Sequence, residues 1–419
     1  MGTKKTLKSR IKGVMPNWVK KTYGKIRQNA IKEKIKDDQA KKWLKKVSKK
    51  ATPGKIIKVG FLVQMSEVWD KQELLYEALS KNKDFETYMI VVPNCDLIKN
   101  VVKNHYDDMF FFNKYDNAIK ALQEDGRWLD LKKLELDYLF YQRPYNAYLP
   151  ECYKSYVVGR YTKCMYIPYA FWPLKESLCG YNKDFYRYVY KAFMESQEHA
   201  KAIQDIHIMP SNIVYCGYPQ LTDAKIAEDY DIRKVLWTPR WSYDPKVGGS
   251  HFLEYKDHIF ELTADFGATE VIIRPHPMSF DNYIRMGLMT EEQVAAYKQR
   301  VEDTSNVCFD DNKNIEDTFE NIGVLITDVS SIVFPFFLTG KPIIFCNTEI
   351  PLSPAFEALL KGIYVADSWE DICTIYSQIV SGNDYLKDVR MEMVDTISKE
   401  HNGAVNNIID ILKKDALFS

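Results

Sequence analysis

The sequence lacks the features that mark secreted, membrane-spanning and zinc-binding proteins. No apolar run approaches the length needed to cross a bilayer, and the N-terminus has no apolar segment like that of a secretory signal. The 8 cysteines are scattered singly, with no Cys-x-x-Cys pair and no Cys/His group at zinc-ligand spacing. We therefore expect a protein that stays in the cytoplasm, has reduced cysteines and has no metal site.

Short repeats and low-complexity tracts are also absent, and the net charge is zero. A chain of 419 residues, 46% hydrophobic and 27% charged, has enough apolar material for two globular cores. Its charge is nevertheless uneven. The first 50 residues hold 18 Lys and Arg against 3 Asp and Glu, and the rest of the chain carries the opposite excess. We expect a basic arm attached to an acidic body.

The basic arm, residues 1–50, has loosely helical spacing of apolar residues and an almost wholly basic polar face. Such a helix can lie on an anionic membrane surface, with Trp18 and Trp43 at the level of the headgroups. A solvated helix that packs one apolar stripe on the body is an equally supported alternative. Nucleic acid is not expected as a partner, because the acidic body offers no large surface for phosphates.

After a Thr-Pro-Gly breaker near residue 53, apolar strand patterns alternate with helical ones. Strands are expected at 58–64, 88–93, 136–141 and 165–168, and helices at 69–79 and 186–202. This alternation predicts βαβ units and a parallel sheet.

The same alternation restarts after residue 210. Strands are expected at 213–215, 234–240, 269–273, 323–327 and 341–346, and a terminal helix at 389–414. The pattern predicts an α/β protein with the GT-B layout, in which two Rossmann-like domains face each other across a cleft. We place the arm at 1–50, the domains at 51–210 and 211–390, and a helix that crosses back at 391–419.

Polar loops follow three strands of the second half, where ligands of open α/β sheets bind. In the loop at 328–334, Ser330 and Ser331 precede an apolar helical run, which suits an anion at a helix N-terminus. On spacing alone, a simple helix cap is the more probable interpretation. Asp328 would orient this turn, because its own charge repels phosphate.

The second loop, Arg-Pro-His-Pro at 274–277, holds a cation and an imidazole in a turn stiffened by two prolines. Arg274 suits bidentate phosphate binding, and His276 can donate to charge that develops on a leaving phosphate. The third loop contributes Arg240, which taken alone is weak evidence for a site.

Several motifs at matching spacing resemble those of the CDP-glycerol glycerophosphotransferase family, the teichoic-acid polymerases and primases. The resemblance spans roughly residues 150–412. It rests on Gly-Tyr-Pro at 217–219 followed by Asp223, and on the segments at 236–241, 274–277, 327–334 and 341–345.

This resemblance implies a GT-B enzyme that uses a CDP-activated polyol as substrate and needs no cofactor. The donor diphosphate would be held by Arg274, His276 and the Ser330–Ser331 turn, with Arg240 nearby. The implied acceptor is a hydroxyl of a glycopolymer or a lipid-linked molecule, with Lys175 on the acceptor side. The implied location is the inner face of the cell membrane, with peripheral attachment.

Two positions depart from the family pattern. Residues 169–175 align with the family's Trp-His-Gly-Thr-Pro-Leu-Lys, but Ala170 stands where the family has its proposed base. The family's Phe-Asp-Phe is Phe-Pro-Phe at 334–336. His251 and His258 are candidate bases, although a surface or core role is favoured for each.

The expected reaction is attack by the acceptor hydroxyl on the donor's β-phosphorus, with release of CMP. A nucleotide-sugar glycosyltransferase on the same fold remains an alternative. So does a non-catalytic assembly subunit, which the Ala170 substitution motivates.

Overall fold

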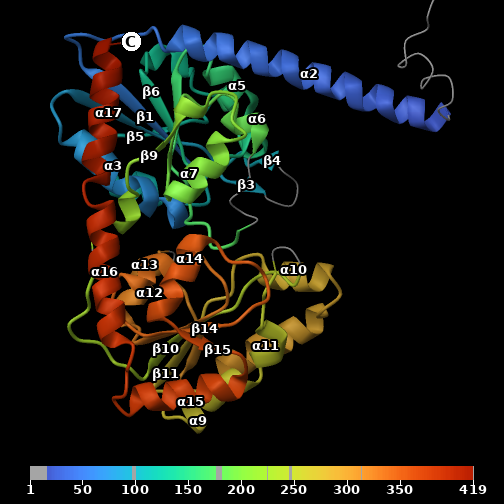
Figure 1. The fold of residues 1–419 in the computed structure, drawn as a ribbon, viewed down its shortest axis with the longest axis vertical. Helices are drawn as coiled ribbons and strands as arrows, with labels where there is room; N and C mark the ends of the chain where they lie inside the picture. Colours follow the sequence, from blue (N-terminus) through green and yellow to red (C-terminus); the bar gives the residue numbers. More distant parts are fainter. Residues whose placement is uncertain are drawn as a thin grey trace, which may run out of the picture.

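The structure is a computed structural model that describes residues 17–96, 101–175, 182–223, 225–244, 248–312 and 314–418. It contains two parallel sheets, each flanked by helices, one in each half of the chain (Figure 1). This architecture agrees with the predicted α/β class with two Rossmann-like domains.

The first sheet has seven parallel strands in the order β5-β2-β1-β6-β7-β8-β9. They are β1 Ile57–Val63, β2 Phe85–Val91, β5 Ala118–Lys120, β6 Tyr138–Tyr141, β7 Lys163–Tyr166, β8 Lys191–Met194 and β9 Ile213–Tyr215. The central strands β6 and β7 are buried throughout, as expected when helices cover both faces of a parallel sheet. A separate antiparallel pair joins β3 Cys95–Asp96 to β4 Val101–Val102.

The second sheet has six parallel strands in the order β12-β11-β10-β13-β14-β15. They are β10 Lys234–Thr238, β11 Glu270–Ile273, β12 Val307–Phe309, β13 Val324–Thr327, β14 Ile343–Cys346 and β15 Tyr364–Ala366. The strands β13 and β14 are again fully buried apolar runs.

Helices of the first half are α2 Asn17–Val47, α3 Asp70–Ser80, α4 Phe110–Lys114, α5 Ser155–Val158, α6 Lys183–Tyr186 and α7 Gln197–Gln204. Those of the second half are α8 Phe252–Tyr255, α9 Glu261–Ala264, α10 Ser279–Arg285, α11 Glu291–Asp303, α12 Ile315–Asn321, α13 Val333–Phe337, α14 Pro354–Leu359 and α15 Trp369–Val380. The chain ends in α16 Lys387–His401 and α17 Ala404–Phe418.

Each sheet reverses its direction of growth at one point. The first sheet grows from β1 through β2 to β5 and then resumes at β6, on the other side of β1. The second grows from β10 through β11 to β12 and resumes at β13, beside β10. Ligands of such sheets bind outside the carboxyl ends of strands at the reversal, which we call the switch point.

Two expectations from the sequence need correction. The helix predicted at 186–202 contains the buried strand β8, and helix α7 starts only after Ser196, whose hydroxyl accepts a hydrogen bond from the backbone N–H of His199. Residues 192–194 are apolar on successive positions, as expected for a strand that is covered on both faces. In addition, β9 pairs with β8, so the first sheet extends past the predicted boundary at residue 210.

The two halves are joined by the segment after β9 and by the C-terminal helices, which run along one side of both domains (Figure 1). Gly217 has a φ of 91°, and a Cβ there would lie 2.8 Å from the Cβ of Ala404 at the start of α17. On α17, Asp415 accepts hydrogen bonds from Tyr138 (2.7 Å) and Lys163 (2.6 Å) of the first sheet. The Gly-Tyr-Pro motif therefore serves the domain junction.

The basic arm forms α2, which is fixed to the first domain near its C-terminal end. The buried Arg187 donates hydrogen bonds to Glu33 and Asp37, two of the three acidic residues of the arm. Trp43 packs between Tyr188, with ring centroids 5.7 Å apart, and the guanidinium of Arg160, 4.6 Å from the Trp43 ring centre. Trp43 thus packs against the body, and its contact with a membrane stays a prediction.

The other predicted membrane residue, Trp18, falls on α2, but its side chain lies outside the described residues, as do residues 1–16. No described helix combines the length and the hydropathy that a bilayer-spanning segment requires.

Candidate active site

The paired serines lie at the switch point of the second sheet, directly after β13. Their backbone N–H groups have no hydrogen-bond acceptor among the described residues, and both side chains are partly exposed. Helix α13 begins only at Val333 and has five residues, so the predicted helix dipole is weak here. The hydroxyl and N–H groups of this turn can still donate hydrogen bonds to an anion. Phosphate binding by Ser330 and Ser331 stays a prediction.

Arg240, which follows β10, connects the loop after β10 to the loop after β13 through hydrogen bonds. Its backbone N–H donates to Asp328 Oδ2 over 2.7 Å, and its Nη1 donates to the carbonyl of Val329 over 2.7 Å. Burial lowers the pKa of Arg240 to about 10, and the nearby charge of Asp328 opposes this shift. The guanidinium therefore stays charged at neutral pH beside the serine turn.

His276 lies at the end of the loop after β11, next to the Trp241 ring, with ring centroids 6.1 Å apart. Its Nδ1 accepts a hydrogen bond from the backbone N–H of Met278 over 3.2 Å, so the neutral ring carries its proton on Nε2. Desolvation by the surrounding protein and the Arg240 charge lower the pKa of His276 to about 4, although the residue is exposed. In the free protein His276 is a neutral hydrogen-bond donor at pH 7.

Arg274 occupies the start of the same loop but turns partly toward the protein. Its Nη1 donates to Asp310 Oδ2 over 2.5 Å and to the carbonyl of Asn312 over 2.7 Å. Asp310 also accepts from Thr318 over 2.7 Å, so the carboxylate is held in place. These bonds stabilise the loop, and contact between Arg274 and a diphosphate remains a prediction.

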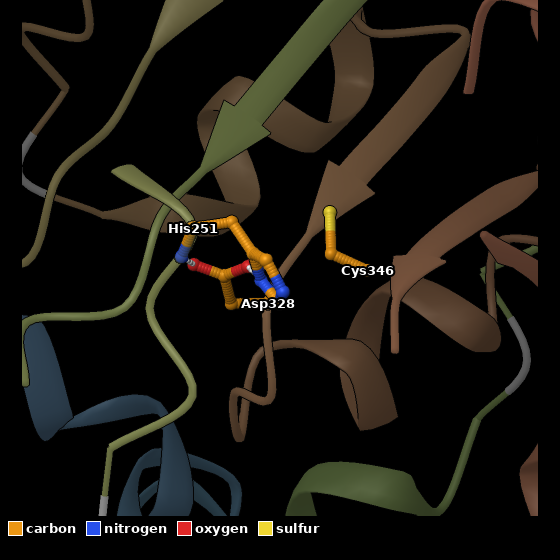
Figure 2. A group of neighbouring side chains, drawn as sticks. All are labelled: His251, Asp328 and Cys346. Atoms are coloured by element: carbon orange, nitrogen blue, oxygen red, sulfur yellow. Dashed lines mark hydrogen bonds and ion pairs between the residues drawn. The ribbon is translucent and has the colours of Figure 1, made fainter. Parts of the chain in front are cut away.

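Asp328 lies in a cluster of side chains that the spacing of residues in the sequence does not predict. His251, Asp328 and Cys346 place their ligand-type atoms within 4.8 Å of one another (Figure 2). Asp328 is fully buried; its Oδ1 accepts from His251 Nδ1 over 2.7 Å, and its Oδ2 accepts from the backbone N–H groups of His251 and Arg240.

These bonds join His251 and Asp328 into a hydrogen-bonded pair. Both carboxylate oxygens of Asp328 are engaged by N–H donors. Burial, with the Asp328 charge adding to it, raises the pKa of the Cys346 thiol well above its usual range, so this thiol keeps its proton and is a poor ligand. Burial also lowers the pKa of His251, but Asp328 outweighs that effect and the net shift is upward.

The segment that aligns with the family's base motif lies at the domain junction. Phe171 stacks on Phe334 of α13, with ring centroids 3.8 Å apart, and the backbone N–H of Lys175 donates to the carbonyl of Pro351 over 3.0 Å. The Lys175 side chain is exposed and Ala170 is partly buried. The acceptor-side role of Lys175 stays a prediction.

Lys341, from the Lys-Pro motif, has a structural position. Its buried Nζ donates to the carbonyls of Phe319 (2.7 Å) and Ile322 (2.6 Å), at the end of α12. This motif therefore supports the sheet and does not contribute a charge to the site.

Comparison with known proteins gives a family match for part of the chain. Residues 182–352 match the model of the family described as CDP-Glycerol:Poly(glycerophosphate) glycerophosphotransferase. The matched span is less than half of the chain, and it includes the loops after β10, β11 and β13 but not Ala170 or Lys175. None of the curated proteins matches the chain.

Solved structures share the fold at low sequence identity. The S. aureus MnaA–UDP structure is 12% identical, covers 87% of this chain and 98% of its own, and has a TM-score of 0.54. A variant of the wall teichoic acid polymerase TagF with CDPG is 12% identical, covers 96% and 98%, and has a TM-score of 0.51. A glycosyltransferase from Rickettsia africae is 11% identical, covers 87% and 100%, and has a TM-score of 0.51.

The fold and the family match define a transferase with the GT-B fold. The resemblance to the CDP-glycerol glycerophosphotransferase family is confirmed, since residues 182–352 match that family's model.

Proposed function

We propose that the protein transfers a polyol phosphate, with glycerol phosphate as the first choice, from a CDP-polyol to a hydroxyl of a cell-surface glycopolymer. Teichoic acid and capsule are both acceptors of this chemistry. The observation that carries the proposal is the meeting of three strand-end loops around Arg240, within the span that matches the family.

In the proposed reaction the acceptor hydroxyl attacks the β-phosphorus of the donor. A new oxygen–phosphorus bond forms, the bond to the CMP phosphate breaks, and CMP and the hydroxyl proton are released. Arg240 and the Nε2–H of His276 would bind the negative oxygens, and the N–H groups of Ser330 and Ser331 would hold the phosphate of the leaving group. Positioning and electrostatics supply most of phosphoryl-transfer catalysis, which accommodates alanine at position 170.

His251 would add to this electrostatic field. Asp328 raises the pKa of its ring, so the imidazole stays positively charged to higher pH than an ordinary histidine. A charged His251 would offset the Asp328 carboxylate, which would otherwise repel the anionic donor at the serine turn.

A panel of donors tests the reaction type. We expect CMP release from CDP-glycerol or CDP-ribitol with a membrane acceptor fraction, and no UDP release from UDP-sugars. Turnover of UDP-sugars alone would favour the glycosyltransferase alternative, and no turnover with any donor would favour the assembly subunit.

The variant His276→Ala should lower CMP release by about 100-fold or more, since it removes a donor to the developing charge. His258→Ala is the matched control, because that exposed ring pairs with Glu261 on the same domain. Equal rates for parent and His276→Ala would remove His276 from the mechanism.

We also propose that α2 holds the enzyme on the anionic inner face of the cell membrane. Ile31 and Ile35 are exposed, and each is nine residues from a buried residue of the helix, Ala40 and Leu44 respectively. Nine residues are two and a half turns, so the two isoleucines lie on the face opposite the body. Lysines flank this outer face, which suits contact with acidic lipid headgroups.

Vesicle co-sedimentation tests this attachment without removing the helix from the body. The combined changes Ile31→Ser, Ile35→Ser and Lys34→Gln should weaken binding to phosphatidylglycerol vesicles, and salt should weaken the parent's binding. Lys361→Gln and Lys387→Gln on the second domain form the control. Unchanged binding by the α2 variant would refute the proposal.

A further inference from the structure

Arg143 lies at the switch point of the first sheet, where no function has been assigned so far. It is the second residue after β6, and Gln64 is the first residue after the neighbouring strand β1. Tyr169 follows the next strand, β7. These three side chains therefore meet at the carboxyl edge of the sheet, at the place where an open parallel sheet binds ligands.

The charge of Arg143 lacks a carboxylate partner in the described part of the chain. Its Nη2 donates to Gln64 Oε1 over 3.2 Å, and its guanidinium lies 4.8 Å from the centre of the Tyr148 ring. Its Nε is fully buried and has no hydrogen-bond partner among the residues that the structure describes. Burial lowers the pKa of Arg143, but an arginine still carries its charge at neutral pH.

Buried basic residues elsewhere in the described chain are matched by anions or carbonyls. Arg187 contacts three carboxylates, and Arg390 contacts Asp384 and two backbone carbonyls. Lys163 contacts Asp415, and Lys341 contacts carbonyls. A partly buried cation without such a partner is costly, so Arg143 departs from the pattern of the molecule.

Tyrosines surround the Arg143 guanidinium. The hydroxyls of Tyr145 and Tyr169 lie 3.0 Å apart, and the rings of Tyr145 and Tyr148 have centroids 5.3 Å apart. Burial raises the pKa of Tyr145 and of Tyr169, so both hydroxyls keep their protons. The cluster thus offers hydroxyl groups and ring faces beside one cation, a combination that suits an anion on a hydroxylated carbon skeleton.

The tyrosine cluster is linked to the serine turn of the second domain by one ring contact. Tyr169 is two residues before Phe171, and Phe171 stacks on Phe334, which lies three residues after Ser331. The tyrosine cluster is thus linked through Phe171 to the helix that follows the serine turn.

We propose that Arg143, Gln64 and the three tyrosines form an acceptor subsite that binds an anionic group, a phosphate or a carboxylate, of a polyhydroxylated acceptor. Arg143 binds the anion and the tyrosines contact the hydroxylated skeleton. The assignment of this ligand as the acceptor rests on the proposed function. The anion site itself does not.

Calorimetric titration of the full chain tests the subsite, with saturating CDP present so that the donor side is filled. The probes are sn-glycerol 3-phosphate and D-glucuronate, and uncharged glycerol is the control. We expect at least one charged probe to bind and glycerol not to bind. CDP binding is measured separately, so its failure would count against the proposed function and leave the anion site testable.

Arg143→Gln should weaken binding of the charged probe about tenfold or more, because charge-assisted hydrogen bonds are lost. Arg127→Gln removes an exposed arginine of the same domain and should leave binding unchanged. Tyr169→Phe, which removes one hydroxyl and little volume, should weaken binding by a smaller factor.

The stability of the free protein separates a ligand site from a structural arginine. Without probe, Arg143→Gln should melt at the same temperature as the parent or higher, since it removes an uncompensated cation. A clearly lower melting temperature for Arg143→Gln, or equal probe binding by Arg143→Gln and parent, would overturn the subsite. Absence of binding by either charged probe to the parent would do the same.

Discussion

The two switch points have the same topology but different electrostatics. In the second sheet, the arginine after β10 lies beside Asp328, whose carboxylate accepts three N–H donors. In the first sheet, the arginine after β6 has an amide oxygen and an aromatic ring as partners. The arginine of the second half therefore has a carboxylate beside it without a ligand, whereas the arginine of the first half would gain an anionic partner only from the proposed ligand.

This difference suits an enzyme whose two substrates differ in size. A nucleotide diphosphate brings several charges and can bind to a site that is already ordered around Asp328. A single cation among tyrosines suits one charged unit of the proposed acceptor.

Removal of Asp328 should have the largest effect on the order of the second switch point. Asp328→Ala leaves two backbone N–H groups and the His251 ring without their acceptor, and it should cost about 3–5 kcal/mol in the second domain. Hydrogen exchange at β10 and β13 measures the loss. Asp328→Asn retains an amide oxygen for the backbone donors and should cost less. Equal protection in parent and Asp328→Ala would show that the buried carboxylate is not needed for this order.

Lys341 tests whether a buried cation with hydrogen-bond acceptors stabilises the fold, in contrast to Arg143, which has no carboxylate partner in the described structure. Lys341→Met leaves the α12 carbonyls without donors and should lower the free energy of unfolding by about 2–3 kcal/mol. The exposed Lys361→Met is the control for the change of side chain. If urea unfolding gave Lys341→Met and Arg143→Gln the same loss, the distinction between matched and unmatched cations would fail.

Much of the fold follows from sequence patterns, because buried parallel strands are short apolar runs that end at polar loops. The strands β1, β10, β11 and β13 lie within a few residues of their predicted places. The strand β8 was missed, since a buried apolar run beside a helix has no periodicity that separates the two structures. The boundary at 210 failed because β9 pairs back to β8, and strand pairing is not visible in one sequence.

The site was predicted in part. Ser330, Ser331 and His276 could be selected because they follow strands and belong to a family pattern. The role of His251 depends on its hydrogen bond to Asp328, 77 residues away in the sequence, and no local sequence pattern predicts that pair. Arg143 was visible as a residue at a strand exit, but its significance lies in the lack of a carboxylate around it in the described structure, which depends on packing.

The smallest predicted effect is a change of stability with pH, which distinguishes His251, whose charge titrates, from Arg143, whose charge is permanent. The folded-state pKa of His251 is raised above its unfolded value, so the bond to Asp328 stabilises the protein below about pH 6.5 and loses that contribution as pH rises through the folded-state pKa. The stability advantage of the parent over His251→Asn should thus shrink by less than about 1 kcal/mol between pH 6 and pH 9. Arg143→Gln should show no such trend, because a guanidinium does not titrate in that range. Urea unfolding at several pH values measures both differences, and a parallel pH trend in the two variants would mean that the two switch points do not differ in the way their charges are held.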